Sequence, residues 1–167
     1  GVKKPREEPL LAATALLKLG KLCGRGDYLS AAEETIEATA AVMQQAPQAA
    51  SHMLIVLDFL LGPSPEIVLL EGAKSEPSLV QACGVHRQFL GSRVLAYRCL
   101  AEPADYRSDS LEDLFRGKTL QNGEAQMFVC QGGACREPVV GQDAINQAIS
   151  DMSDGKAFTS SAPGAAI

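Results

Sequence analysis

The chain has 167 residues, 46% of them hydrophobic, and a formal net charge of −5. This acidic balance argues against nucleic-acid and anionic-membrane partners, which bind clustered lysine and arginine, and no apolar run approaches the roughly 20 residues that cross a bilayer. Five cysteines without regular spacing argue against a secreted disulfide framework and predict a reducing, cytoplasmic location.

The first part of the chain predicts three helices. The basic segment 1–8 is not followed by the apolar stretch and cleavage site of a signal peptide, and we expect a chain that begins partway through a larger architecture. An amphipathic pattern predicts a helix over 9–23, and Asp27 is expected to cap a second helix. A third, strongly apolar helix is expected to begin near Pro47 and to end at Gly62. Such a helix must be covered on more than one side.

The turn between the first two helices contains the tripeptide Arg25-Gly26-Asp27, which some cell-surface receptors bind. Glycine for a positive φ and aspartate for a helix cap are also what any tight turn between helices needs. We therefore interpret this segment as a turn and not as an adhesion motif.

The second part of the chain predicts a βαβ unit. The short apolar run Ile67–Leu70 is typical of a strand that is covered on both faces. A helix is expected to begin at Pro77, and a second strand is expected over 93–97. A crossover of this length predicts that the two strands are parallel.

After this unit, Ser110 is expected to start a short helix, and a third strand is expected over 125–130. Asp143 is expected to cap a last helix, and residues 153–167 have no periodicity and are expected to form a flexible tail.

Together these elements predict an α/β protein. A helical segment over 1–62 is followed by a small, mostly parallel three-stranded α/β domain over 66–152. The residues expected to be buried are Leu54, Leu57, Leu61, Ile67, Leu69, Leu95 and Val129.

The third helix contains the candidate catalytic residue Asp58. His52 lies six residues before it, which places the two about 240° apart on a helix, so they cannot pair. Asp58 is either a hydrogen-bonded structural residue or a pocket residue. His86, with no second ligand at a suitable spacing, is interpreted as a histidine at the edge of the core. No glycine-rich phosphate-binding motif is present, so no cofactor is predicted.

The cysteines are the other candidate for chemistry. In a parallel sheet, Cys99, Cys130 and Cys135 would approach one edge, but a zinc site needs a fourth ligand, so no metal is predicted. The glycine loop between Cys130 and Cys135 permits a reversible disulfide, although the two-residue spacing of dithiol oxidoreductases is absent. We expect reduced, packed thiols, with Cys135 the more reactive.

Several motifs resemble the carboxy-terminal part of the spermatogenesis-associated, thioredoxin-domain-containing family, which has no firmly assigned activity. The resemblance runs from about Leu10 to about Met152. It is carried by Leu57-Asp58-Phe59-Leu60-Leu61-Gly62-Pro63, Pro65-Glu66-Ile67-Val68, Gly117-Lys118-Thr119, and Phe128-Val129-Cys130 with Cys135 and Pro138.

This resemblance implies that the three helices are the last helices of an (α/α)₆ toroid of the glycosidase and epimerase type. It also implies that their binding partner is the remainder of the full-length chain, including a thioredoxin-like domain. The implied function is that of a non-catalytic structural or interaction part. One alternative is a carbohydrate-active full-length enzyme with Asp58 near its pocket. Another is a thiol-redox accessory module that uses Cys130 and Cys135.

Overall fold

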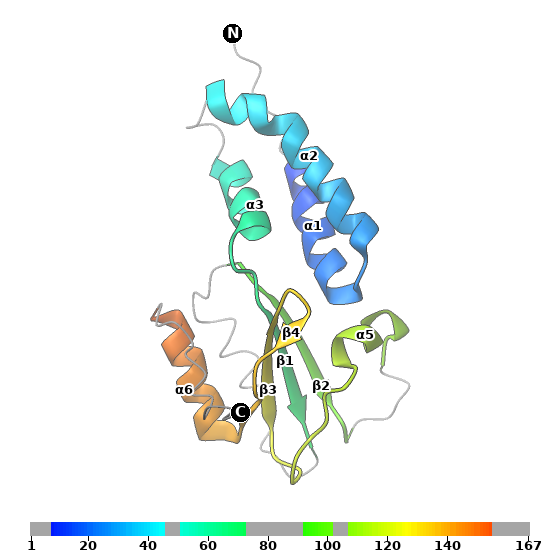
Figure 1. Ribbon diagram of the computed structural model, residues 1–167, viewed down its shortest axis with the longest axis vertical. Coiled ribbons are helices and arrows are strands. Elements are labelled where there is room, and N and C mark those ends of the chain that lie inside the picture. Colours follow the sequence, from blue (N-terminus) through cyan, green and yellow to red (C-terminus); the bar gives the residue numbers. More distant parts are fainter. Residues whose placement is uncertain (1–7, 46–50, 73–91, 102–106, 155–167) are drawn as a thin grey trace, which may run out of the picture. The chain divides into compact units, whose positions relative to one another are not determined.

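The computed structural model describes residues 8–45, 51–72, 92–101 and 107–154. Figure 1 shows their helices and strands. The chain divides into two compact units. The first is helical and comprises Gly1–Pro65, Ser92–Val94 and Ser108–Arg116; the second contains most of the sheet and comprises Glu66–Gly91, Leu95–Arg107 and Gly117–Ile167.

The helical unit contains α1 (Glu8–Cys23), α2 (Gly26–Gln45) and α3 (Ser51–Leu61), which confirms the three predicted helices. Gly20 lets α1 and α2 approach closely, because a Cβ on it would lie 2.6 Å from the Leu29 side chain. The core of this unit joins all three helices and consists of Ala13, Leu17, Ala32, Ile36, Val56, Phe59 and Val94.

The short helix predicted from Ser110 is present in two pieces, η3 (Asp109–Leu111) and α5 (Glu112–Phe115). Both contact α1. Leu114 and Phe115 are buried, so this segment is packed and is not only a connection.

The sheet contains β1 (Glu66–Glu71), β2 (Val94–Cys99), β3 (Gln126–Gln131), β4 (Ala134–Cys135) and β5 (Val139–Val140). Its order is β2-β1-β3-β4, and β5 also pairs with β3. The Val94 amide donates to the Pro65 carbonyl, and the Leu100 amide donates to the Glu71 carbonyl. Both bonds join residues 29 positions apart (94 − 65 and 100 − 71), so β1 and β2 are parallel, as predicted.

The prediction of a mostly parallel, three-stranded sheet is wrong, because β3 runs antiparallel to β1 and two further short strands follow it. The physical reason is the turn before β3, where Asn122 and Gly123 both have a positive φ and the Glu124 amide bonds the Gln121 carbonyl. Asn-Gly favours this tight reversal. After this turn β3 begins beside the carboxyl end of β1, so its first residue, Gln126, pairs with Leu70.

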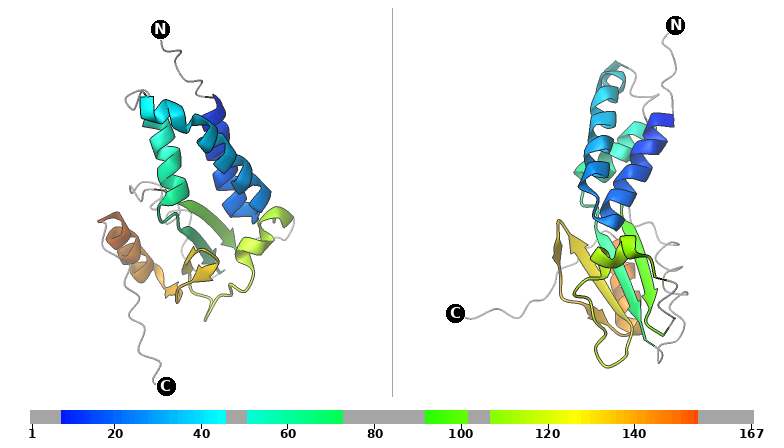
Figure 2. Two further views of the ribbon diagram at one scale, coloured as in Figure 1. Left: turned by 45° about the horizontal axis from the view of Figure 1, so that its top comes forward. Right: turned by 90° about the vertical axis from the view of Figure 1, so that its right-hand side faces the viewer.

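One face of the sheet is covered by α6 (Gln142–Ser153), the predicted last helix (Figure 2). Ile67, Leu69 and Val129 are buried there, as predicted, and Leu95 is partly buried. The other members of this core are Ala125, Met127, Ile145, Ala148 and Ile149.

The other face of the sheet carries the alternate residues of the same strands, including the buried Val68, Leu70 and Phe128. Gln126 is also buried on this face. With its amide oriented so that both contacts are satisfied, its nitrogen donates to the Thr119 carbonyl at 3.0 Å and its oxygen accepts from the Gln121 amide at 2.6 Å. Burial on both faces confirms the prediction made for β1.

Several predictions concern residues outside the described ranges. These are the start of the third helix near Pro47, the helix expected from Pro77, the histidine His86, and most of the tail, residues 155–167. Among the helices in the described ranges, none combines the length and apolar character needed to cross a membrane.

Candidate functional sites

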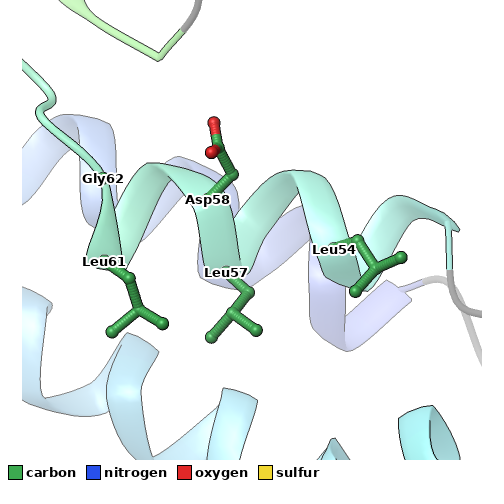
Figure 3. A pocket seen from close by; sticks show the side chains of 5 residues that line it. All are labelled: Leu54, Leu57, Asp58, Leu61 and Gly62. Carbon is green, nitrogen blue, oxygen red and sulfur yellow. The ribbon is translucent and has the colours of Figure 1, made fainter.

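The outer face of α3 is apolar and open. Leu54, Leu57 and Leu61, spaced by three and four residues, project on one side of the helix (Figure 3). Together with Asp58 and Gly62 they line an open hollow of about 360 Å³. Leu54 and Leu61 are 50% and 74% exposed, and Leu57 is only partly buried, so the prediction that Leu54 and Leu61 are buried is wrong.

The reason for this error is that α3 is apolar on more than one side. Its residues Met53, Val56 and Phe59 are buried. Leu57 packs against the edge of the helical core, whereas Leu54 and Leu61 stay exposed. Ile55 adds a further exposed side chain, at 63%. Hydrophobic composition identifies a helix that must be buried, but it does not show which of its faces this chain buries.

Asp58 is exposed and lies on α3, with its side chain directed away from the three leucines (Figure 3). The Ser92 hydroxyl donates to its Oδ2 at 3.0 Å, which supports the interpretation of Asp58 as a hydrogen-bonded structural residue. Among the described residues that line the hollow, Asp58 is the one that ionises. Glycoside hydrolysis ordinarily uses a pair of carboxyl groups that flank the bond. The described lining of the hollow therefore contributes one carboxyl group and not such a pair.

The Arg25-Gly26-Asp27 segment begins in the connection between α1 and α2 and continues into the first turn of α2. Asp27 therefore lies inside the helix and not at the predicted capping position, and the glycine with a positive φ is Gly24 and not Gly26. Arg25 Nε and one Nη atom donate to the two Asp27 carboxylate oxygens at 2.8 and 2.6 Å, and the guanidinium lies 4.3 Å from the centre of the Tyr28 ring. The hydrogen bond from Arg25 lowers the pKa of Asp27. Because the two charged groups bind each other, this geometry supports the turn interpretation.

Cys130 and Cys135 form a disulfide, with an S–S distance of 2.07 Å. The prediction of reduced, packed thiols is therefore wrong. The loop between them is a two-residue β-hairpin, because Gly132 and Gly133 have φ values of 59° and 82° and β4 pairs with the end of β3. This pairing places the two cysteines directly opposite each other, with a Cα–Cα distance of 3.9 Å.

Cys99 does not join this pair, so the predicted approach of three thiols to one edge is wrong. Cys130 pairs with Glu66 at the start of β1. Cys99 lies beside the other end of β1, because the amide of the next residue, Leu100, donates to the carbonyl of Glu71. The five residue steps from Glu66 to Glu71 span about 16 Å. Within the described part of the chain, no group of histidine, cysteine and acidic side chains could hold a metal ion.

The surroundings of the disulfide are asymmetric. Cys130 is 2% exposed, whereas Cys135 is exposed on the short strand β4. Glu66 lies directly opposite Cys130, and its carboxylate interacts with Lys118. Partial burial lowers the pKa of Lys118, and the charge of Glu66 opposes that shift. The residue paired with Cys130 thus has a lysine as its electrostatic partner.

Sequence reasoning missed a second polar pair. Glu71 is 4% exposed, and the Tyr97 hydroxyl donates to its Oε2 at 2.5 Å. The two residues lie at the carboxyl ends of the parallel strands β1 and β2. Only the strand register brings them together, so no local motif could have indicated the pair.

No family model, curated protein or solved structure matches this chain. Function is therefore inferred from the open leucine face of α3 and from the disulfide hairpin.

Proposed function

We propose that this chain is a non-catalytic structural or interaction part of a larger protein, whose further helices cover the outer face of α3. The exposed leucine face, with Leu54 and Leu61 beside the hollow, carries the proposal. A helix that is apolar on all sides is normally buried on all sides. Covering one exposed leucine completely stabilises a fold by about 1.5–3 kcal/mol.

The spacing of the leucines fits a helix as the covering element. Residues three and four apart form one continuous ridge, and ridges of this kind pack into the grooves of a neighbouring helix. The side chains of this ridge are aliphatic, and the Asp58 carboxylate points away from them (Figure 3). An apolar helix face therefore fits this surface better than a polar ligand does.

The resemblance to the spermatogenesis-associated, thioredoxin-domain-containing family suggests which helices these are. In this proposal α1, α2 and α3 are the last helices of an (α/α)₆ toroid, and the remaining toroid helices of the full-length chain pack on Leu54, Leu57 and Leu61. The partner is then the rest of the same protein.

A carbohydrate-active full-length enzyme is the alternative within the same architecture. It would need a second carboxyl group near Asp58, contributed by the rest of the protein. The hydrogen bond from Ser92 and the direction of the Asp58 side chain, away from the leucines, favour the non-catalytic role.

The test compares Leu61→Lys in the full-length protein and in this chain. If other helices cover Leu61, the substitution should lower the stability of the full-length protein by about 2 kcal/mol or more. It should change the isolated chain by less than about 0.5 kcal/mol, because Leu61 is exposed there. Leu100→Lys, at a leucine that is 40% exposed in the other unit, is the control. Equally small effects of Leu61→Lys in both proteins would contradict the proposal.

A further inference from the structure

We propose that the Cys130–Cys135 disulfide is a thiol–disulfide exchange site, which a dithiol opens and which a disulfide closes again by the reverse exchange, within the folded hairpin. This site lies in the second unit and is independent of the helix-packing role of α3. Its substrate class is a small or protein-borne dithiol.

The hairpin holds the two cysteines together without the covalent bond. Gln131 and Ala134 pair next to the Gly132-Gly133 turn, and the Arg136 amide donates to the Val129 carbonyl at 3.1 Å on the other side of the disulfide. The cysteines therefore occupy the position between two hydrogen-bonded pairs, where facing side chains are closest. After reduction, the same backbone pairing keeps the thiols in position to form the bond again.

The disulfide also contributes little to the stability of the fold. Its stabilising effect on a fold grows with the length of the loop that it closes, and here the sequence separation is only five residues. The glycine turn and the strand pairing already close that loop. The bond can therefore open while the fold is kept, as an exchange site requires.

The difference in exposure sets the direction of attack. An incoming thiolate reaches Cys135 on the exposed strand β4 more readily than Cys130, which is 2% exposed. Cys130 is then the leaving group. Lys118 offsets the charge of Glu66, which lies opposite Cys130, and so reduces the repulsion between that carboxylate and the Cys130 thiolate.

The reaction is a two-electron exchange. A thiolate of the dithiol attacks Cys135 Sγ, the protein S–S bond breaks, and Cys130 leaves as a thiolate that takes a proton from water. The second thiolate of the reductant attacks its own sulfur in the mixed disulfide, and Cys135 leaves as a thiolate and is protonated. The reductant becomes a disulfide, and the protein gains two thiols.

The first experiment treats the native chain with increasing dithiothreitol, blocks free thiols with N-ethylmaleimide and locates them by peptide mass spectrometry. An exchange site should open at a rate proportional to dithiothreitol concentration, while circular dichroism shows that the fold is kept. A rate that stops rising and equals the global unfolding rate would overturn the proposal, because the bond would then open only through unfolding.

The second experiment tests the direction of attack with oxidised glutathione. In Cys130→Ser, the remaining Cys135 should form the mixed disulfide at least about tenfold faster than Cys130 does in Cys135→Ser. Equal rates, or faster reaction at Cys130, would overturn the assignment. Circular dichroism of both variants shows that they are folded, and Cys99, which the same peptide mapping follows, is the internal reference.

Discussion

The Tyr97 hydroxyl donates a 2.5 Å hydrogen bond to the Glu71 carboxylate and thereby links the carboxyl ends of β2 and β1. Because Glu71 is 4% exposed, water cannot readily replace a lost donor. The bond therefore stabilises the end of the parallel strand pair.

Tyr97→Phe should lower the free energy of unfolding by about 1–3 kcal/mol, because it removes a donor from a buried carboxylate. A urea melt measures the loss. Tyr28→Phe, which removes a hydroxyl from a partly exposed tyrosine beside the α1–α2 turn, is the control and should cost less than about 0.5 kcal/mol. Equal losses for both variants would show that the Glu71 bond contributes little.

The two faces of α3 should differ sharply in their effect on stability. Phe59, which is 5% exposed, belongs to the core of the helical unit, so Phe59→Ala should cost about 3–5 kcal/mol. Leu61→Ala, at a residue that is 74% exposed in the same helix, should cost less than about 1 kcal/mol in this chain. Denaturant melts of both variants compare the faces. A large loss for Leu61→Ala would mean that its face is covered in solution.

The helices and the first two strands could be predicted because their signals are local. Amphipathic periodicity identifies α1, and the apolar run from Ile67 identifies β1. The direction of β3 could not be predicted from its own residues, since the Asn122-Gly123 turn decides from which end the chain enters the sheet. Strand pairing depends on such connections as well as on the apolar pattern.

The candidate sites were predicted in part. Asp58 and the cysteine pair were identified, but the disulfide was not expected, although Gly132-Gly133 is the kind of dipeptide that closes a two-residue hairpin. In such a hairpin the residues one position outside the closing pair face each other, so the sequence did contain the signal. The exposure of Leu54 was not predictable, because it depends on which elements pack around α3.

The glycine turn should control how fast the reduced hairpin closes again. Gly133 has a φ of 82°, which a residue with a Cβ rarely adopts, and the space around it is open, so Gly133→Ala adds backbone strain without a steric clash. We expect the disulfide of this variant to re-form about threefold to tenfold more slowly under oxidised dithiothreitol. Gly26→Ala is the control, since Gly26 also has open space but no positive φ. An unchanged closing rate would mean that the turn does not position the thiols.

Lys118 should make stability depend on pH in the alkaline range. Partial burial lowers its pKa below the usual 10.5, so the folded state loses the lysine proton before the unfolded state does. The unfolded state therefore binds more protons between the two pKa values, and the contribution of Lys118 to stability rises with pH there. Below that window the desolvated ammonium is a net cost, which the charge of Glu66 reduces.

Lys118→Met removes this cost and keeps a side chain of similar length. At neutral pH the variant should be at least as stable as the unsubstituted protein, and the difference should shrink as the pH rises through the window below 10.5. Urea melts at a series of pH values follow the difference. Lys18→Met, at an exposed lysine on α1, is the control and should show no such trend. A difference that grows with pH, or a clear loss of stability at neutral pH, would show that the interaction of Lys118 with Glu66 outweighs the cost of its burial.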